Sequence, residues 1–276
     1  MGEGLMRVAI VGMGAIGHVV KRALDGRAEI VEVDRTRSPL RDGERPVDVA
    51  IVCTKTFGTG WAAEQSARVL APGGLALTIQ NGLGNLETLA ARIGAERAAA
   101  GVIYVGAALR PDRSLFATGP GRVELGNDPR LDELARALED GGMTVARVPD
   151  PLRSVWQKLL VNAAMNATSA VFRLTNGELV DHSAAGPLAD GIAREVARVA
   201  TASGLPIADD DAVAAWRRIA SALGDNRSSM LQDVEGGRRT EVEAINGAVA
   251  DRGERVGVQA PLNRAFTILV AAFHPD

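Results

Sequence analysis

Short apolar runs rich in valine, isoleucine and alanine recur along the first half of the chain. Such runs suit parallel strands that are buried on both faces of a sheet. They are residues 6–11, 29–33, 47–54 and 75–79, with further strands expected at 99–105, 114–118, 122–125 and 143–148. Helical spacing of apolar residues is present at 15–24, 61–70 and 131–139. Strands that alternate with helices predict an α/β domain with a doubly wound parallel sheet.

The strand pattern stops at Pro149-Asp150-Pro151. Beyond this point, apolar residues recur at intervals of three and four, which is helical spacing. Helices are expected at 156–166, 184–203, 212–223 and 260–273, with a helical pair from residue 228 onward. Asp150 can cap the first of these helices, with Pro151 at its first position. We therefore predict an α/β domain over residues 1–150 and an all-helical domain over residues 151–276.

Two stripes of different character run along the helix expected at 156–166. Its apolar residues have the spacing of a buried face. Lys158, Asn162 and Asn166 follow one another at intervals of four and form a polar stripe. One interpretation is a face turned to solvent. Asparagine is unfavourable inside a helix because its amide competes with the backbone, so two in register favour a functional stripe.

Lysine is rare in this chain. Only three of the 31 basic residues are lysines, namely Lys21, Lys55 and Lys158, and the others are arginines. Arginine keeps its proton at any working pH, whereas lysine can release one, and burial lowers its pKa. A lysine beside two amides, as at Lys158, is therefore a candidate proton donor to a carbonyl oxygen.

A glycine-rich turn stands between the first strand and the first helix. Its six residues are Gly12, Met13, Gly14, Ala15, Ile16 and Gly17. Gly12 permits the tight turn, Gly14 lets the backbone approach a pyrophosphate, and Gly17 lets helix and strand pack closely. The N–H groups at the start of the helix favour an anion. This strand–turn–helix context indicates a dinucleotide-binding motif, so the first domain is expected to be of the Rossmann type.

Polar residues follow the next three strands at the same expected edge of the sheet. Asp34 and Arg35 follow the second strand. The acid would accept from the ribose 2′-OH of NAD, whereas the arginine would pair with the 2′-phosphate of NADP, and we favour NADP. Lys55 ends the third strand, and Asn81 follows the fourth within QNGLGN at 80–85. Both are expected to contact the cofactor, with Asn81 near the nicotinamide ribose. The alternative for QNGLGN is an ordinary strand-to-helix turn in which Asn85 caps the helix that follows.

Composition excludes several other classes of protein. The net charge of −3 and the pI of 5.8 argue against a nucleic-acid-binding protein. No apolar run reaches the roughly 18 residues of a membrane span. The single cysteine, Cys53, excludes an internal disulfide, and we expect no metal site. Cys53 lies in an apolar strand, so a buried thiol is favoured over a nucleophile. We expect a cytoplasmic protein that acts on a small molecule.

Several motifs stand in one order along nearly the whole chain. They are the glycines at 12, 14 and 17, Lys55, QNGLGN at 80–85, WQKLLVNAAMN at 156–166, NGEL at 176–179 and NRSSMLQDVEGGRRTEVEAINGAV at 226–249. Together they resemble the ketopantoate reductase (2-dehydropantoate 2-reductase) family, and the long motifs are more specific than the glycines. The resemblance implies NADPH-dependent reduction of 2-dehydropantoate to (R)-pantoate, a step of pantothenate and coenzyme A biosynthesis.

The resemblance also implies roles for individual residues. Lys158 would be the catalytic lysine that protonates or polarises the ketone oxygen, and Glu241 the acid that orients substrate and supports this lysine. The implied substrate-binding residues are Asn162, Asn166, Asn226 and Ser229. Arg35 and Lys55 would lie near the 2′-phosphate, and Asn81 beside the cofactor and the lysine. Hydride transfer from nicotinamide C4 would develop charge on the ketone oxygen, and a cationic donor would stabilise that charge.

Two features depart from the family pattern on the adenosine side of the cofactor. The connection at 35–46 is shorter than is usual in the family, and Asp34 would repel a 2′-phosphate. NADH is therefore kept as an alternative to NADPH.

Two other functions are kept open. A related NAD(P)-dependent reductase of another 2-keto or imino acid would use the same glycines and Lys158. A non-catalytic dinucleotide-sensing protein would bind the nucleotide without turnover. A lactate-type enzyme would need a histidine paired with an acid. It is disfavoured because the histidines of this chain, His18, His182 and His274, lie outside every motif. The fold also invites a homodimer through the helical domain.

Overall fold

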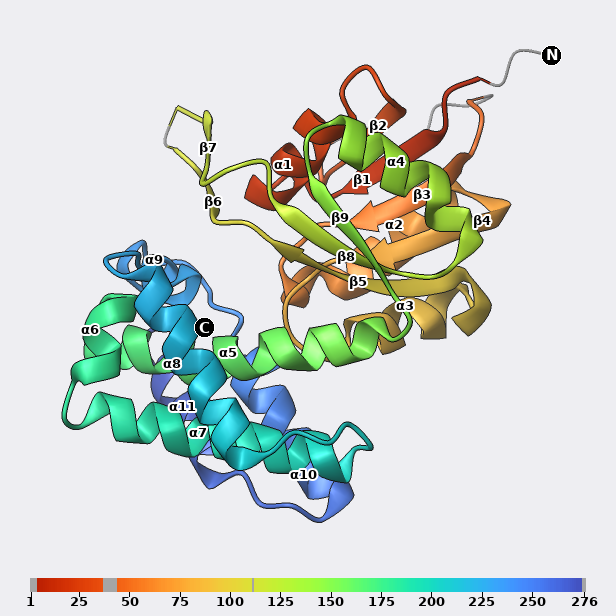
Figure 1. Cartoon of the computed structure of the whole chain (residues 1–276). Helices are drawn as coiled ribbons and strands as arrows, with labels where there is room; N and C mark the ends of the chain where they lie inside the picture. Colours follow the sequence, from red (N-terminus) through yellow and green to blue (C-terminus); the bar gives the residue numbers. More distant parts are fainter. Residues whose placement is uncertain (1–3, 37–43, 111, 275–276) are drawn as a thin grey trace. The chain divides into compact units, whose positions relative to one another are not determined.

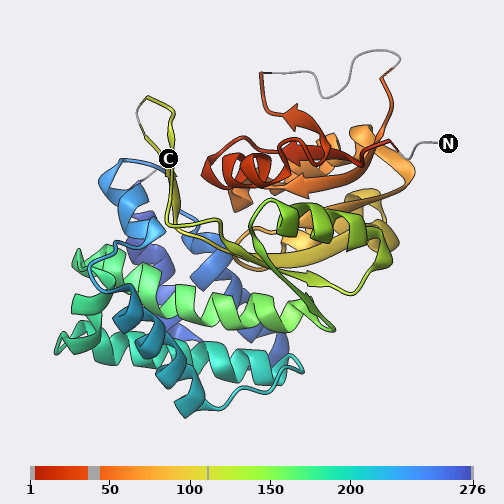
Figure 2. The same cartoon turned by 45° about the horizontal axis from the view of Figure 1, so that its top comes forward.

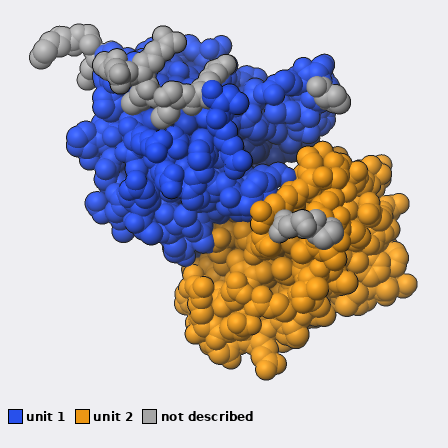
Figure 3. Space-filling view, turned by 180° about the vertical axis from the view of Figure 1, so that it is seen from behind, with its two compact units in different colours: residues 1–80, 84–154 blue, residues 81–83, 155–276 orange. Residues whose placement is uncertain are grey.

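The computed structural model describes residues 4–36, 44–110 and 112–274. The chain divides into two compact units, coloured separately in Figure 3. Unit 1 comprises Met1–Gln80 and Gly84–Ser154, and unit 2 comprises Asn81–Leu83 and Val155–Asp276. Three residues of the QNGLGN segment thus belong to the second unit, although strands and helices of the first unit flank them in the sequence.

Seven strands form one sheet in the described part of unit 1, in the order β2-β1-β3-β4-β5-β8-β9 (Figure 1). Their bounds are β1 Arg7–Val11, β2 Glu29–Val33, β3 Val47–Val52, β4 Leu70–Thr78, β5 Ala98–Tyr104, β8 Arg122–Gly126 and β9 Thr144–Val148. β1 pairs in parallel with both β2 and β3, so Val8 stands opposite Ile30 and Val49. The strand order reverses between β1 and β3, which is where sheets of this kind bind ligands.

The sheet is parallel from β2 to β5, but β8 pairs with β5 in the antiparallel sense and β9 runs parallel to β8. Between β5 and β8 the chain forms a hairpin of β6 Ala107–Leu109 and β7 Leu115–Ala117. Figures 1 and 2 show this yellow hairpin standing away from the sheet. Because the hairpin supplies no crossover helix, the chain re-enters the sheet antiparallel.

Each face of the sheet is covered by a pair of helices. α1 Ala15–Leu24 and α4 Asp132–Asp140 pack on the face that carries Val8 and Ile10. α2 Thr59–Val69 and α3 Asn85–Ile93 pack on the face that carries Ala9 and Val11. Because side chains alternate along β1, the strand contributes residues to the core on both faces of the sheet, as expected for a doubly wound sheet.

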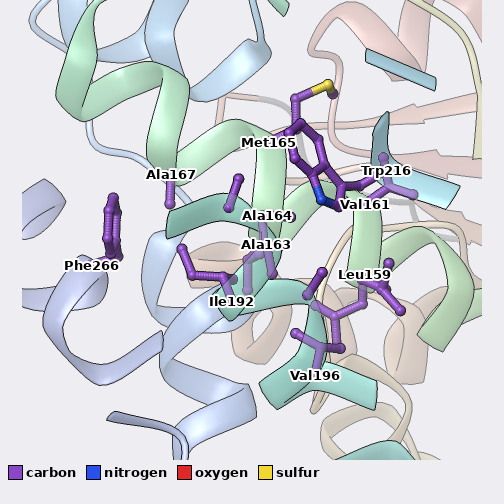
Figure 4. Packing of buried hydrophobic residues seen from close by; sticks show 14 of the residues in the cluster. Leu159, Val161, Ala163, Ala164, Met165, Ala167, Ile192, Val196, Trp216 and Phe266 are labelled. Atoms are coloured by element: carbon purple, nitrogen blue, oxygen red, sulfur yellow. The ribbon is translucent and has the colours of Figure 1, made fainter. Parts of the chain in front are cut away.

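Unit 2 consists of helices in its described residues. They are α6 Asn176–Asp181, α7 Ala185–Ala202, α8 Asp209–Leu223, α9 Ser229–Glu235, the π-helix η4 Glu243–Gly247, α10 Ala248–Val256 and α11 Pro261–Ala271, together with most of α5 Pro151–Phe172. Figure 4 shows α5 side chains such as Leu159 packed with Ile192 and Val196 of α7. Trp216 of α8 is fully buried in the same cluster. α5 is thus the central helix of this core.

The prediction of an α/β fold with a helical second part is confirmed, and its details need correction. α5 extends well beyond the expected 156–166, and Leu152 in its added first turn is 43% exposed. β6 and α6 were not among the expected elements. Asn85 is the first residue of α3 and not its cap, because the N-cap is Gly84. None of the described helices is long and apolar enough to cross a membrane.

Candidate active site

The carboxyl ends of neighbouring strands in unit 1 carry the residues predicted to bind a cofactor. Gly12 directly follows β1, Asp34 and Arg35 follow β2, and Lys55 lies three residues after β3. Parallel strands in adjacent positions end at the same edge of a sheet. The order β2-β1-β3 therefore gathers these residues around the switch point.

The three glycines of the turn differ in what a side chain would meet. Gly12 has a φ of +107°, and a Cβ there would lie 2.7 Å from the backbone nitrogen of Thr54. A Cβ at Gly17 would lie 2.1 Å from the carbonyl oxygen of Gly12. A Cβ at Gly14 would meet no heavy atom of the described structure within 4 Å. Gly12 and Gly17 are thus required by the fold, whereas Gly14 leaves the backbone open to a ligand.

The start of α1 is suited to an anion. Its N-cap is Gly14, and no side chain caps the helix in the described structure. The first N–H groups of a helix have no partner inside the helix, and the helix dipole adds to their attraction for negative charge. Met13 and Ile16 pack partly buried against the core of unit 1, which holds the turn in place. These features fit the diphosphate of a dinucleotide.

Asp34 and Arg35 differ in their surroundings. Both the backbone N–H and the hydroxyl of Thr36 donate to Asp34 Oδ1, over 2.8 and 2.6 Å. Asp34 is partly buried, whereas Arg35 is exposed. A carboxylate that caps its own turn has fewer lone pairs left for a ribose. The shortened connection after Arg35 falls largely outside the described residues, which resume at 44.

A hydrogen-bond network that the sequence analysis missed ties the ends of β3 and β4 together. Gln80 donates from Nε2 to the backbone oxygen of Thr54 at 2.9 Å and to the hydroxyl of Thr59 at 2.9 Å. Thr59 in turn donates to Asn85 Oδ1 at 2.8 Å. Lys55 is the residue that follows Thr54, and it stands at the N-cap position of the short 3-10 helix Thr56–Gly58, where its carbonyl oxygen accepts from the N–H of Gly58. The network therefore holds the backbone that presents Lys55.

In unit 2, the segment Asn81–Leu83 is fastened to the chain around Glu241. The N–H of Leu83 donates to the carbonyl oxygen of Ala244 at 3.0 Å. Gly82 has a φ of +80°, and a Cβ there would lie 2.3 Å from the same oxygen. Asn81 donates from Nδ2 to Glu241 Oε2 at 3.3 Å. Only a glycine between Asn81 and Leu83 permits this close approach.

Glu241 directly precedes an irregular helix. The π-helix η4 begins two residues later, at Glu243, and continues into α10. π-helical turns are rare in proteins, but those that do occur are often found at functional sites. The amides of Ala244 and Ile245 both donate to the carbonyl oxygen of Glu241, each over 3.1 Å. The backbone of Glu241 is thus held at the entry to the wide turn.

Lys158 is a cation of unit 2 whose pKa is lowered. Burial lowers its pKa from 10.5 to about 8, and the carboxylate of Glu241 opposes this shift by favouring the charged form. The polar stripe of α5 is not a solvated face, because Lys158 and Asn162 are only partly exposed and Asn166 is 3% exposed. A lysine that titrates near neutral pH is suited to donate a proton in catalysis.

A buried pair of hydroxyls joins the end of this stripe to α9. Ser169 donates to the backbone oxygen of Asn166 at 3.0 Å, and its Oγ lies 2.7 Å from that of Ser228. Ser228 is the N-cap of α9 and accepts from the N–H of Leu231. Ser229, the predicted substrate contact, is the first residue of α9 and is exposed. Its neighbour Ser228 thus links the start of α9 to the last turn of α5.

Asn226 is exposed, and its carbonyl oxygen accepts from the N–H of Asn176 at 2.9 Å. The Asn176 side chain is 2% exposed, and its Oδ1 has no hydrogen-bond partner among the described residues. A buried amide oxygen without a partner is costly, so Asn176 is a further candidate for binding a polar ligand. The capping box of Thr175 and Glu178 at the start of α6 was the available sequence signal for this position.

Other reactive side chains do not form a centre in the described residues. No group of three or more His, Cys, Asp and Glu side chains there could hold a metal ion. Cys53 is buried, and burial raises the pKa of its thiol, which suppresses the nucleophilic thiolate. His182 accepts through Nδ1 from the amides of Ala184 and Ala185, so its ring is engaged at the start of α7.

Two family models match this chain. Residues 26–130 match the model described as ketopantoate reductase PanE/ApbA, and residues 150–274 match its C-terminal model. The 2-dehydropantoate 2-reductase of Archaeoglobus fulgidus is 33% identical over 96% of this chain and 97% of its own. That of Halobacterium salinarum is 32% identical over 98% of this chain and 100% of its own.

Solved structures agree with this result. The 2-dehydropantoate 2-reductase from Geobacter metallireducens is 28% identical with a TM-score of 0.86, covering 97% of this chain and 99% of its own. A D-mandelate dehydrogenase solved with NADH and anilino(oxo)acetate superimposes with a TM-score of 0.88 over 97% of this chain and 98% of its own. At 23% identity, that second likeness shows a shared fold.

Proposed function

Because this chain belongs to the ketopantoate reductase family of NAD(P)H-dependent oxidoreductases, we propose that it reduces 2-dehydropantoate to (R)-pantoate with NADPH. This reaction serves pantothenate and coenzyme A biosynthesis. The observation that carries the proposal is the group formed by Asn81, Lys158 and Glu241 in unit 2. Its lysine has a pKa near 8, and its carboxylate is bonded to the amide of Asn81.

Lys158 is the proposed proton donor. Reduction of a ketone places negative charge on its oxygen, and a cation aimed at that oxygen lowers the barrier. With a pKa of about 8, Lys158 is mostly charged at neutral pH and can still give up its proton. Glu241 raises the pKa of Lys158 against the effect of burial, so its proposed role is to keep the donor charged.

The substrate is proposed to contact amides and a hydroxyl of unit 2. The proposed contacts are Asn162, Asn166, Asn226 and Ser229. Asn162 and Asn166 share one face of α5 with the lysine, and Ser229 opens α9 beside the buried hydroxyl pair. A 2-keto acid offers a carboxylate and carbonyl oxygens to such donors. Holding it in one orientation contributes several kcal/mol to catalysis, by roughly the measure of well-oriented intramolecular reactions.

Unit 1 is proposed to bind the cofactor through the turn from Gly12 to Gly17. The open backbone at Gly14 and the uncapped start of α1 fit a diphosphate, and the edge residues Arg35 and Lys55 fit the adenosine side. When bound, the reduced nicotinamide supplies the hydride that goes to the keto carbon. The proposed preference for NADPH rests on the exposed Arg35 and on the two bonds that Asp34 receives from Thr36.

The test is an absorbance assay of nicotinamide oxidation with 2-dehydropantoate, run in parallel with NADPH and NADH. We expect turnover with NADPH at roughly 1 to 1,000 per second, the ordinary range for enzymes. Turnover with NADH alone would keep the reaction and make Asp34 the residue that reads the ribose. Nucleotide binding without turnover of this acid, tested against a panel of other 2-keto and imino acids, would refute the substrate or the enzymatic role.

A homodimer is proposed as the assembly. A solved ketopantoate reductase from Staphylococcus aureus is described as dimeric. At 20% identity this likeness shows the fold alone, so the assembly of this chain needs its own measurement. Light scattering of the purified protein would give the mass directly, and a value near 28.8 kDa would refute the dimer.

A further inference from the structure

Asn246 lies in the π-helix η4 and is completely buried. Its Nδ2 donates to the backbone oxygen of Ala163 in α5 and to Oδ1 of Asn263 in α11, each over 3.1 Å. One side chain therefore connects three helices of unit 2. Both of its N–H groups are used in these two bonds.

The connection continues to α7 through a buried carboxylate. Asn263 is completely buried and donates from both its backbone N–H and its Nδ2 to Glu195 Oε2, each over 2.9 Å. The N–H of Leu262 donates to the other oxygen of Glu195, also over 2.9 Å. Glu195 is 6% exposed and caps the start of α11, where the helix dipole favours its negative charge. Asn246 is thus attached to a fixed framework.

The orientation of Asn246 has only one solution. Rotating the amide by half a turn would point its oxygen at the two acceptors that it now binds, Ala163 O and Asn263 Oδ1. In the present orientation, Asn246 Oδ1 is buried without a partner among the described residues. An orphaned buried acceptor costs about 1–3 kcal/mol. The side chain keeps both of its donor bonds at this cost, so it is held in one orientation as a cross-link between the helices.

The two bonded segments are those that carry the proposed catalytic pair. Ala163 follows Lys158 by five residues along α5, and Asn246 follows Glu241 by five residues. Between Glu241 and Asn246 lies Ala244, whose carbonyl oxygen holds the segment of Asn81. The Asn246–Ala163 bond is therefore a direct link between the helix of the lysine and the turn of the acid.

We propose that Asn246 is a positioning residue for the reaction, which sets the distance between Lys158 and Glu241 by fastening the π-helix to α5. This inference rests on the proposed function. Loss of the bond would let the π-helical turn relax away from α5, because a wide turn is less stable than an α-helical one. The acid would then support the lysine less well, and the donor would be misplaced relative to a ketone.

A movement of Glu241 away from Lys158 would be visible as a change in the pKa of this lysine. Among the described residues, Glu241 is the charged group that raises the pKa of this lysine against burial. If the carboxylate moves away, the pKa of Lys158 falls below about 8. The basic limb of the pH profile of kcat then moves to lower pH, which a simple loss of folded protein would not cause.

The experiment compares Asn246→Ala and Asn246→Ser with the parent in the full-length chain. We expect kcat for 2-dehydropantoate to fall about 10- to 100-fold in Asn246→Ala, the effect of a small misplacement, and less in Asn246→Ser, which keeps one donor. The KM for NADPH should change less than kcat, because the expected cofactor contacts of unit 1 are unaltered and only Asn81, whose segment is held by Ala244, can move with the π-helix. The basic limb should move down by about half a pH unit or more.

Asp190→Asn is the matched control. Asp190 stands five residues before Glu195 on α7 and binds Arg217 and the indole N–H of Trp216. Its loss should lower stability without moving the pH profile. An Asn246→Ala enzyme with parental kcat and pH profile would overturn the inference, as would an equal shift in Asp190→Asn. If Asn246→Ala does not fold, the same comparison is made with Asn246→Ser. Absence of turnover in the parent would instead refute the proposed function.

Discussion

Replacing Lys158 by methionine should strongly slow catalysis and at the same time stabilise unit 2. The folded protein holds this lysine in surroundings that lower its pKa from 10.5 to about 8. Below about pH 8 the amine is charged in both the folded and the unfolded chain, so folding must carry the charge into an unfavourable place. At about 1.4 kcal/mol per pKa unit, the cost is about 3 kcal/mol. Methionine has a similar length and carries no charge.

The sign of the pH dependence follows from the same values. Between about pH 8 and 10.5 the unfolded chain keeps the proton on Lys158 and the folded chain loses it. The free energy of unfolding of the parent therefore rises with pH through that window, and the destabilisation by the buried charge of Lys158 has disappeared above it. The advantage of Lys158→Met should be about 3 kcal/mol near pH 7 and should shrink steadily toward pH 10.

Denaturant unfolding followed by tryptophan fluorescence measures this difference. Trp156 and Trp216 lie in unit 2 and Trp61 lies in unit 1, so a Trp61→Phe background makes the signal report unit 2 alone. Taking the difference between variant and parent at each pH removes titrations common to both. Arg198→Met is the control, because its exposed ion pair with Asp209 should contribute at most about 1 kcal/mol.

Activity completes the test. Loss of a general acid should lower kcat by about 10²- to 10⁴-fold in Lys158→Met, with nucleotide affinity unchanged. A Lys158→Met protein that is less stable than the parent, or whose gain does not change between pH 7 and 10, would refute the argument from burial. An unchanged kcat would remove Lys158 from the mechanism.

Four further outcomes are expected. Glu241→Gln should lower the pKa of the catalytic lysine, so its kcat should begin to fall at lower pH than in the parent, as a pH profile would show. Gly14→Ala should leave the melting temperature unchanged and weaken dinucleotide binding, measured by calorimetry, whereas Gly17→Ala should destabilise the fold because its Cβ would clash with a carbonyl oxygen. Arg35→Ala should raise the KM for NADPH about tenfold and leave that for NADH unchanged, as parallel kinetics would reveal. Asn176→Ala should raise the KM for the keto acid more than it lowers kcat, and the opposite split would argue against a binding role.

Local patterns determined much of the fold. The bounds of α1 and β2 follow directly from the sequence, because β-branched runs and three-and-four spacing act over a few residues. The glycine turn was also determined locally, since its strand and helix lie on either side of it. The polar stripe on α5 could be located from spacing alone. Spacing alone could not show whether that stripe faces solvent, because its burial depends on the helices packed around it.

Tertiary structure decided the contacts between residues far apart in the sequence. Asn81 follows a strand of unit 1, yet it lies with unit 2 and donates to Glu241, 160 residues away. The antiparallel return of β8 depends on a hairpin, of which the sequence predicted the second strand, β7, but not its three-residue partner β6. The pKa of Lys158 likewise arises from burial and a distant carboxylate. Periodicity records only which side of an element is apolar, whereas these properties depend on which surfaces meet when the chain packs.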